Sequence, residues 1–157
     1  MHERKHTWKT LLHGIIWIAI ALIIFGILNL VANYVREANF HLIVSFLNHN
    51  LLLIILISLI TLFGDVFEDL NFPFNIFYPF ARAVASVIIV IFVFRTIEFV
   101  DMVGGTGIYE LAYNFYYLAL IIIPFIVLVV GFSSLIIHYW PKRRVDKGKP
   151  KKSPRKK

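Results

Sequence analysis

Four long apolar stretches dominate the chain and indicate its architecture. They run from Thr10 to Asn33, Leu47 to Gly64, Ile76 to Phe94 and Leu111 to Tyr139. About 20 helical residues cross a hydrocarbon core of roughly 30 Å, so each stretch is close to the length of a membrane span. The stretches are continuously apolar and lack the alternation of a membrane β-strand. The pattern therefore predicts an all-α, polytopic integral membrane protein with four transmembrane helices in a bundle.

The composition narrows the protein classes that remain. Hydrophobic residues make up 59% of the 157 residues and charged residues 16%, against about 45–50% and about 25% in soluble domains. This balance excludes an ordinary soluble enzyme. Cysteine is absent, which excludes disulfides, thiol nucleophiles and cysteine-based zinc sites.

The basic residues are concentrated at the C-terminus. Residues 141–157 hold ten of the sixteen Lys and Arg residues, so the sequence divides into a four-span domain, 1–140, and a disordered polybasic cytoplasmic tail, 141–157. Because the tail directly follows a span, anionic phospholipid headgroups are favoured over nucleic acid as its partner. The candidate lipid-binding residues are Lys142, Arg143, Arg144, Lys147, Lys149, Lys151 and Lys152.

The same charges predict the orientation in the membrane. Arg4, Lys5 and Lys9 precede the first stretch, whereas the link from Tyr34 to Phe46 contains only Arg36. Basic residues near span ends favour the cytoplasmic side. We therefore expect a multi-pass protein of the cell membrane with both termini in the cytoplasm.

Two arginines, one inside the third stretch and one at the start of the link that follows it, are candidates for intramembrane charges. Arg82 and Arg95 are thirteen residues apart, about 20 Å along a helix and less than the roughly 30 Å of the hydrocarbon core. Such charges mark functional sites by default, although near span ends we favour snorkelling or structural pairing over transport. The expected acidic partners are Asp65, Glu68 and Asp69 for Arg82, and Glu98, Asp101 and Glu110 for Arg95.

Small and polar residues predict helix contacts and one turn. Ala19, Gly26 and Asn33 recur every seven residues beside Asn29, as in a face where helices approach closely and asparagine bonds across the gap. Gly104 to Gly107 is expected to form a turn. The residues Glu110, Tyr113, Asn114 and Tyr117 have the spacing of a single helical face.

One catalytic motif occurs, at the start of the chain. His2, Glu3 and His6 match the H-E-x-x-H pattern of zinc peptidases. No third ligand follows, so we favour a solvated terminus that sets orientation, and we assign no catalytic, cofactor or metal residues. The leading hypothesis is a non-enzymatic accessory, scaffold or assembly subunit, with a membrane-protein partner or a second copy of itself. The alternative is an oligomeric ion channel or small transporter that uses the intramembrane residues Arg82, Arg95, Glu98 and Glu110.

Overall fold

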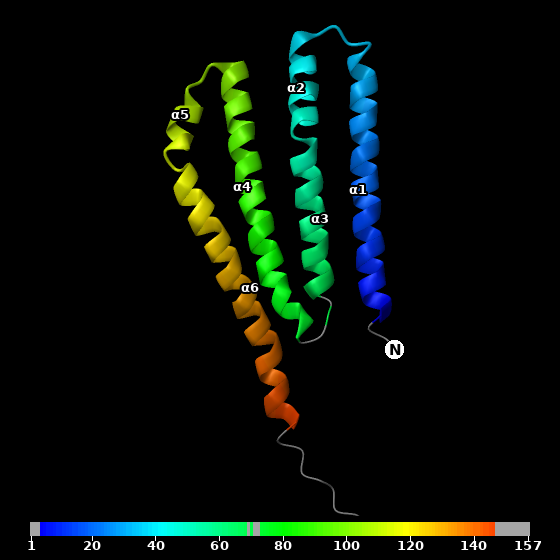
Figure 1. Cartoon of the computed structure of the whole chain (residues 1–157), viewed down its shortest axis with the longest axis vertical. Helices are drawn as coiled ribbons and strands as arrows, with labels where there is room; N and C mark the ends of the chain where they lie inside the picture. The colour runs from blue at the N-terminus through cyan, green and yellow to red at the C-terminus, as the bar shows by residue number, and fades with distance from the viewer. Residues whose placement is uncertain (1–3, 69, 71–72, 147–157) are drawn as a thin grey trace, which may run out of the picture.

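The computed structural model describes residues 4–68, 70 and 73–146, with side chains over 8–68, 70 and 73–137. Its elements, all helices, are α1 (Arg4–Ala32), α2 (Ala38–His49), α3 (Leu51–Glu68), the 3₁₀ turn η1 (Phe74–Ile76), α4 (Phe77–Gly104), α5 (Ile108–Tyr113) and α6 (Tyr116–Asp146) (Figure 1). Four segments are long and apolar enough to cross a membrane: Trp8–Ala32, Leu51–Glu68, Phe74–Gly104 and Tyr116–Ile137. The all-α class and the four apolar helices are therefore confirmed.

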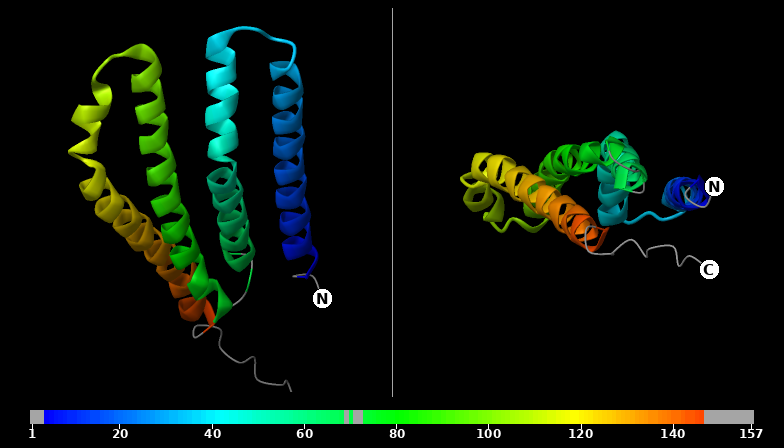
Figure 2. Two further views of the ribbon diagram at one scale, coloured as in Figure 1. Left: turned by 45° about the horizontal axis from the view of Figure 1, so that its top comes forward. Right: turned by 90° about the horizontal axis from the view of Figure 1, so that it is seen from below.

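The long helices run alternately up and down, so the start of α1 and the end of α6 lie at the same end of the molecule (Figure 1). α4 packs extensively against α3 and α6, whereas α1 packs against α2 and α3 at one edge (Figure 2). Within the described residues, no comparable contact joins α1 to α4 or α6. The helices thus form an open row, an arrangement that the predicted four-helix bundle leaves unspecified. In lipid, apolar surface gains little from burial, so nothing forces such a row to close.

The second apolar stretch belongs to a longer helical rod that is interrupted at Asn50. The Asn50 amide donates to the carbonyl groups of Phe46 and Leu47, and the Ile54 amide donates to the Asn50 carbonyl, at 3.1–3.2 Å. The expectation that residues 34–46 form a link is wrong, because most of them belong to α2. The Phe46 ring of this segment stacks on Phe99 of α4 with 4.4 Å between centroids.

α4 is ten residues longer at its C-terminal end than the sequence pattern predicts, since it ends at Gly104 and not at Phe94. Arg95 therefore lies within the helix and does not begin a link. The helix ends where Gly105 adopts a left-handed φ of 60°, and the Gly105 amide caps the Asp101 carbonyl at 2.7 Å. Glycine adopts this conformation without steric cost. Gly107 has a φ of 72°, so the predicted turn is confirmed.

The fourth stretch is broken between α5 and α6, at Asn114 and Phe115. The single helical face expected around Glu110 is therefore interrupted. The rings of Tyr113 and Tyr116 lie parallel across the break, 6.1 Å apart. Their contact accompanies the change of direction between the two helices (Figure 1).

α6 continues to Asp146, so residues 141–146 are helical and the expected disorder from residue 141 onward is wrong for them. Lysine and arginine are good helix formers, and positive charge near a helix C-terminus is favourable. Lys142, Arg143 and Arg144 lie on this last part of α6, where only the backbone is described. The other tail candidates, Lys147, Lys149, Lys151 and Lys152, lie outside the described residues.

The close helix contacts occur at Gly14 and Gly131, whereas the sequence predicts one at Gly26. A Cβ atom on Gly131 of α6 would lie 2.8 Å from Cβ of Pro79, whereas a Cβ atom on Gly26 would meet nothing within 4 Å. Ala19, Gly26 and Asn33 are exposed. Within this chain, the prediction that they form a packing face is wrong, because α1 turns another side toward α3.

Candidate functional site

Polar side chains gather in two tiers, one near each end of the long helices. In the lower tier, at the end of the molecule where α1 starts and α6 ends (Figure 1), Arg82 joins α4 to α3. Its Nη2 atom lies 2.8 Å from Oδ1 of Asp65 and 3.6 Å from Oε2 of Glu68. The guanidinium also lies 5.0 Å from the centre of the Tyr78 ring, within the range of a cation–π interaction. The structure thus brings Arg82 together with two of its three predicted partners, and the third, Asp69, lies outside the described residues.

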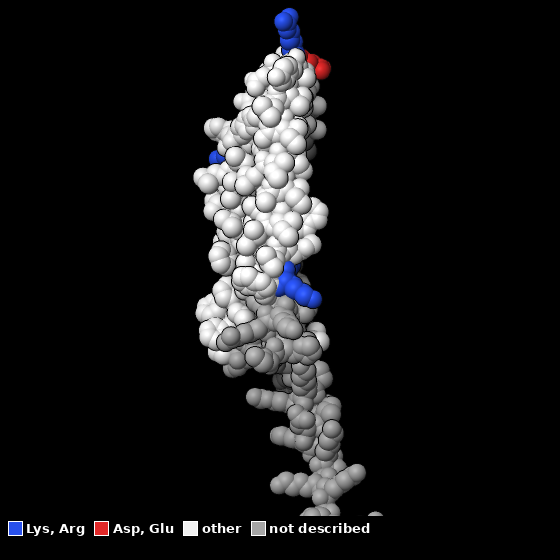
Figure 3. All heavy atoms as spheres, turned by 90° about the vertical axis from the view of Figure 1, so that its right-hand side faces the viewer, with Lys and Arg blue, Asp and Glu red and all other residues white. Residues whose placement is uncertain are grey.

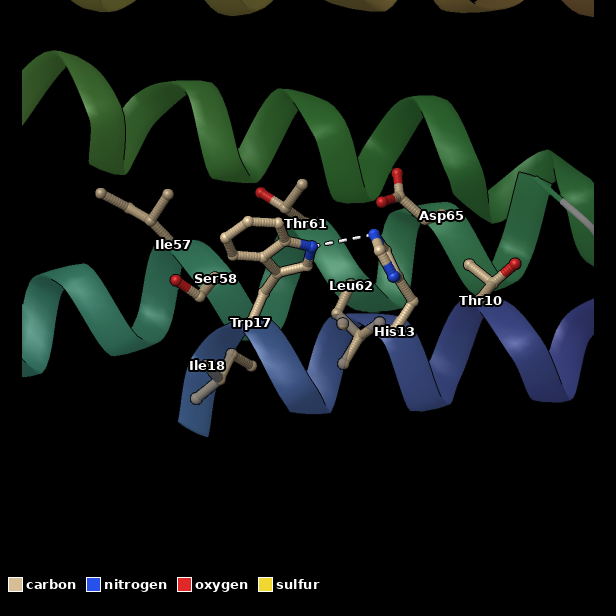
Figure 4. A pocket seen from close by; sticks show the side chains of 10 residues that line it. Thr10, His13, Trp17, Ile18, Ile57, Ser58, Thr61, Leu62 and Asp65 are labelled. Atoms are coloured by element: carbon tan, nitrogen blue, oxygen red, sulfur yellow. Dashed lines mark hydrogen bonds between the residues drawn. The ribbon is translucent and has the colours of Figure 1, made fainter. Parts of the chain in front are cut away.

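A cavity of about 380 Å³ opens between α1 and α3 beside this ion pair (Figure 4). Asp65, His13 and Trp17 are among its lining residues. The indole Nε1 of Trp17 donates a hydrogen bond of 2.8 Å to Nε2 of His13. The Leu62 side chain covers Gly14, where a Cβ atom would collide with it. The cavity arises because α1 meets α3 at this narrow contact.

The upper tier links three helices through asparagine side chains. Asn29 of α1 and Asn48 of α2 exchange two amide hydrogen bonds of 2.9 and 2.6 Å, so the expected bonding of Asn29 across a helix gap occurs. Asn50 is 2% exposed. Its Oδ1 accepts a bond of 3.1 Å from Nη1 of Arg95, and its Nδ2 donates to the Phe46 carbonyl at 2.9 Å.

The predicted acidic partners of Arg95 do not pair with it. Asp101 instead accepts bonds from the Thr106 hydroxyl at 2.7 Å and the Ile108 amide at 3.1 Å, which fixes the turn into α5. Glu98 forms no ion pair within the described residues, and Glu110 lies exposed in the first turn of α5. The expectation failed because it placed Arg95 at a span end. The continuous α4 instead presents Arg95 to Asn50, at the break between α2 and α3.

A second cavity, of about 230 Å³, lies between α4 and the α5–α6 break. Arg95 and Glu98 line it from α4, and Tyr109, Tyr113 and Tyr116 line it from the opposite side. The three rings contact one another in sequence, with centroids 5.7 and 6.1 Å apart. A hydrogen bond with Tyr117 raises the pKa of Tyr113 above its ordinary value.

The distance between the two tiers is similar along α4, α3 and α1. The separations are thirteen residues between Arg82 and Arg95, fifteen between Asp65 and Asn50, and sixteen between His13 and Asn29, or about 20, 22 and 24 Å. The visible face of α1 has charged groups at both ends and little charge between them, apart from one basic group at its margin (Figure 3). Apart from that group, no Lys, Arg, Asp or Glu is visible on this face between its two ends (Figure 3).

Asn50 is the site residue that sequence reasoning missed. Asn48 and Asn50 lie near the start of the second apolar stretch, where the sequence alone favours a hydrated interfacial position, yet Asn50 is buried at a helix break. The available signal was the polar triplet Asn48-His49-Asn50, which is followed directly by a long apolar run. An amide there needs a partner, and Arg95 lies forty-five residues away in the sequence.

The described residues contain no group of three or more His, Cys, Asp or Glu side chains that could hold a metal ion. His2 and Glu3 of the H-E-x-x-H match lie outside the described part of the chain. The described part of the chain is therefore an all-helical protein with four helices long and apolar enough to span a membrane. Comparisons with protein-family models, with curated proteins and with solved structures find no match.

Proposed function

We propose that this chain is a multi-pass protein of the cell membrane that acts as a non-enzymatic accessory, scaffold or assembly subunit. The observation that carries the proposal is the open edge of the helix row. α1 touches the rest of the chain through α2 and α3, and its opposite side is exposed at Ala19 and Gly26. A membrane helix with small residues on an open side can accept another helix at close range.

The proposed orientation places both termini in the cytoplasm and the upper tier on the outer side. Lys9 and the basic tail, which includes Lys142, Arg143 and Arg144, then follow the preference of cytoplasmic ends for positive charge. The described ends of α1 and α6 lie at the same end of the molecule, which fits this arrangement (Figure 1). The tail would lie against anionic lipid headgroups at the inner surface.

The alternative, an ion channel or small transporter, has less support. Arg82 is engaged by Asp65 and Arg95 by Asn50, so neither guanidinium is free of protein contacts. The two described cavities share no lining residue and lie in different tiers. A path across the membrane would therefore need further copies of the chain.

Site-specific photo-crosslinking in native membranes tests the assembly role. A photoreactive residue at Gly26 should form one discrete adduct of fixed size, either with a second copy or with one partner protein. The same group at Ala85, which is 4% exposed, serves as the matched control and should label only within the chain. With the photoreactive residue at Ala19 instead, a Gly26→Leu variant should lose the adduct while it keeps its melting temperature. A monomer without adducts at Gly26, or an ion flux from purified protein in liposomes, would overturn the proposal.

The orientation is tested separately by reporter insertions. Reporters after Arg36, Asn71 and Gly105 should read outside, inside and outside, respectively. An outside reading at Asn71 would contradict both the number of spans and the charge argument.

A further inference from the structure

We propose that the upper cavity binds a zwitterionic group that carries a phosphate and an ammonium, as in the headgroup of a neutral phospholipid. Arg95 would hold the phosphate, and Glu98 with the rings of Tyr109, Tyr113 and Tyr116 would hold the ammonium. This inference rests on the proposed membrane placement but is independent of the assembly role.

The two charged side chains of the cavity have hydrogen-bonding groups that no described residue occupies. Arg95 uses Nη1 to contact Asn50, and within the described residues its remaining donors have no hydrogen bond or ion pair. Glu98 has neither kind of partner in the same part of the chain. The two side chains are three residues apart on one helical face and line one cavity, yet they do not neutralise each other by direct contact. The buried Asn50 amide holds the arginine in place.

The charge balance of the cavity points to a zwitterion. A guanidinium binds phosphate oxygens through paired, charge-assisted hydrogen bonds. A carboxylate next to electron-rich aromatic faces attracts an ammonium group. Because one positive and one negative group line the same space, a net-neutral ligand with both charges satisfies each of them. A purely anionic headgroup would instead meet the Glu98 carboxylate.

The height of the cavity fits a lipid headgroup. The fourth apolar span begins at Tyr116, and Tyr116 lines the cavity together with Arg95. Arg95 therefore lies level with the start of that span, although α4 continues for nine residues beyond it. Tyrosine rings are typical of this boundary between hydrocarbon and water. A phospholipid in the outer leaflet has its phosphate at the same level.

The test is a melting experiment on the full chain in detergent micelles, with phosphatidylethanolamine, phosphatidylglycerol or free phosphoethanolamine added. Phosphatidylethanolamine should raise the melting temperature by about 3 °C or more, and phosphatidylglycerol should raise it by less than half as much. A response to free phosphoethanolamine alone at the same molar ratio would assign the site to a soluble ligand of this chemistry. A response confined to the lipid would assign it to a membrane headgroup.

Three variants separate binding from folding. Arg95→Gln retains a donor for Asn50 and should lose most of the lipid-induced shift. Glu98→Gln leaves a net positive cavity and should reverse the preference toward phosphatidylglycerol. Glu110→Gln, which removes an acid outside the cavity, should behave as the unchanged protein does. Equal shifts with both lipids in the unchanged protein, or an unaltered preference in Glu98→Gln, would overturn the inference. If either outcome occurred while the reporters gave the expected topology, the headgroup site would be wrong but the proposed membrane placement would remain supported.

Discussion

The two helices α4 and α1 are both long and apolar, yet the chain uses them in opposite ways. α4 lies between α3 and α6, and it contains the buried residues Pro79, Ala83, Ala85, Ser86 and Val90. α1 is the more apolar of the two spans, but a smaller share of it is buried. Hydropathy therefore does not predict burial here. In lipid, close packing and hydrogen bonds determine which helix lies inside.

The contacts of these helices differ in the same way. Pro79 of α4 fits against Gly131 of α6, and next to it the rings of Phe80 and Phe132 meet edge to face at 5.5 Å. α1 meets α3 at Gly14 beside a cavity of about 380 Å³. The contact between Pro79 and Gly131 belongs to the core of the chain. The contact at Gly14 leaves most of α1 available to lipid or to a partner.

The largest expected effect comes from Gly131→Ala, which fills the α4–α6 contact. The new Cβ would lie 2.8 Å from Cβ of Pro79 and 3.2 Å from its Cα. Because a proline ring cannot rotate away, the helices must move apart, at a cost of about 1–3 kcal/mol relative to Gly26→Ala. Denaturant unfolding in micelles measures the difference. Gly26→Ala is a matched control because its new methyl group meets nothing. Equal stability of the two variants would show that the contact between Gly131 and Pro79 has room for an added methyl group.

The ion pair between α4 and α3 should contribute the next largest effect. Arg82→Leu removes the cation from two carboxylates, and the side chains of Arg82 and Asp65 are 43% and 38% exposed. We expect a loss of about 1–2 kcal/mol, between the values for exposed and buried pairs. Arg82→Lys should lose less, and Arg36→Leu in the α1–α2 link should lose almost nothing. Unchanged melting of Arg82→Leu in micelles would mean that the side chain only snorkels.

Gly14→Ala tests the weaker contact of α1. The added methyl group collides with the end of the Leu62 side chain, which can rotate toward the neighbouring cavity. We therefore expect a loss of about 0.5–1 kcal/mol relative to Gly26→Ala, at the low end of overpacking costs. The same unfolding experiment gives the number. A loss as large as that of Gly131→Ala would remove the proposed contrast between the two contacts.

The smallest effect is expected for the amide pair that joins α1 to α2. A double-mutant cycle with Asn29→Ala and Asn48→Ala should give a coupling energy of about 0.6 kcal/mol, which is typical of hydrogen bonds between membrane helices. Additive single effects would mean that the pair does not hold α1 in the row. A coupling above about 2 kcal/mol would mean that α1 is anchored mainly through this tier.

Local patterns in the sequence were sufficient for several features. Continuous apolar runs predicted the four long helices, and the glycines before Ile108 predicted the turn that Gly105 and Gly107 form. Asp65 and Glu68 were correctly expected near Arg82, because they lie where the second span ends and Arg82 lies where the third begins. Each of these inferences depends on residues that are close in sequence or on the length of a run.

The tertiary structure decided the features that depend on contacts between distant residues. Phe46 of α2 and Phe99 of α4 both lie beyond the apolar runs and stack on each other, and Asn50, not one of the nearby acids, accepts a hydrogen bond from Arg95. The open row could not be predicted either, since an apolar run has the same pattern whether it faces lipid or protein. Apolar length is a property of one segment, whereas the packing of Gly131 on Pro79 depends on the shapes of two segments that meet only in the folded chain.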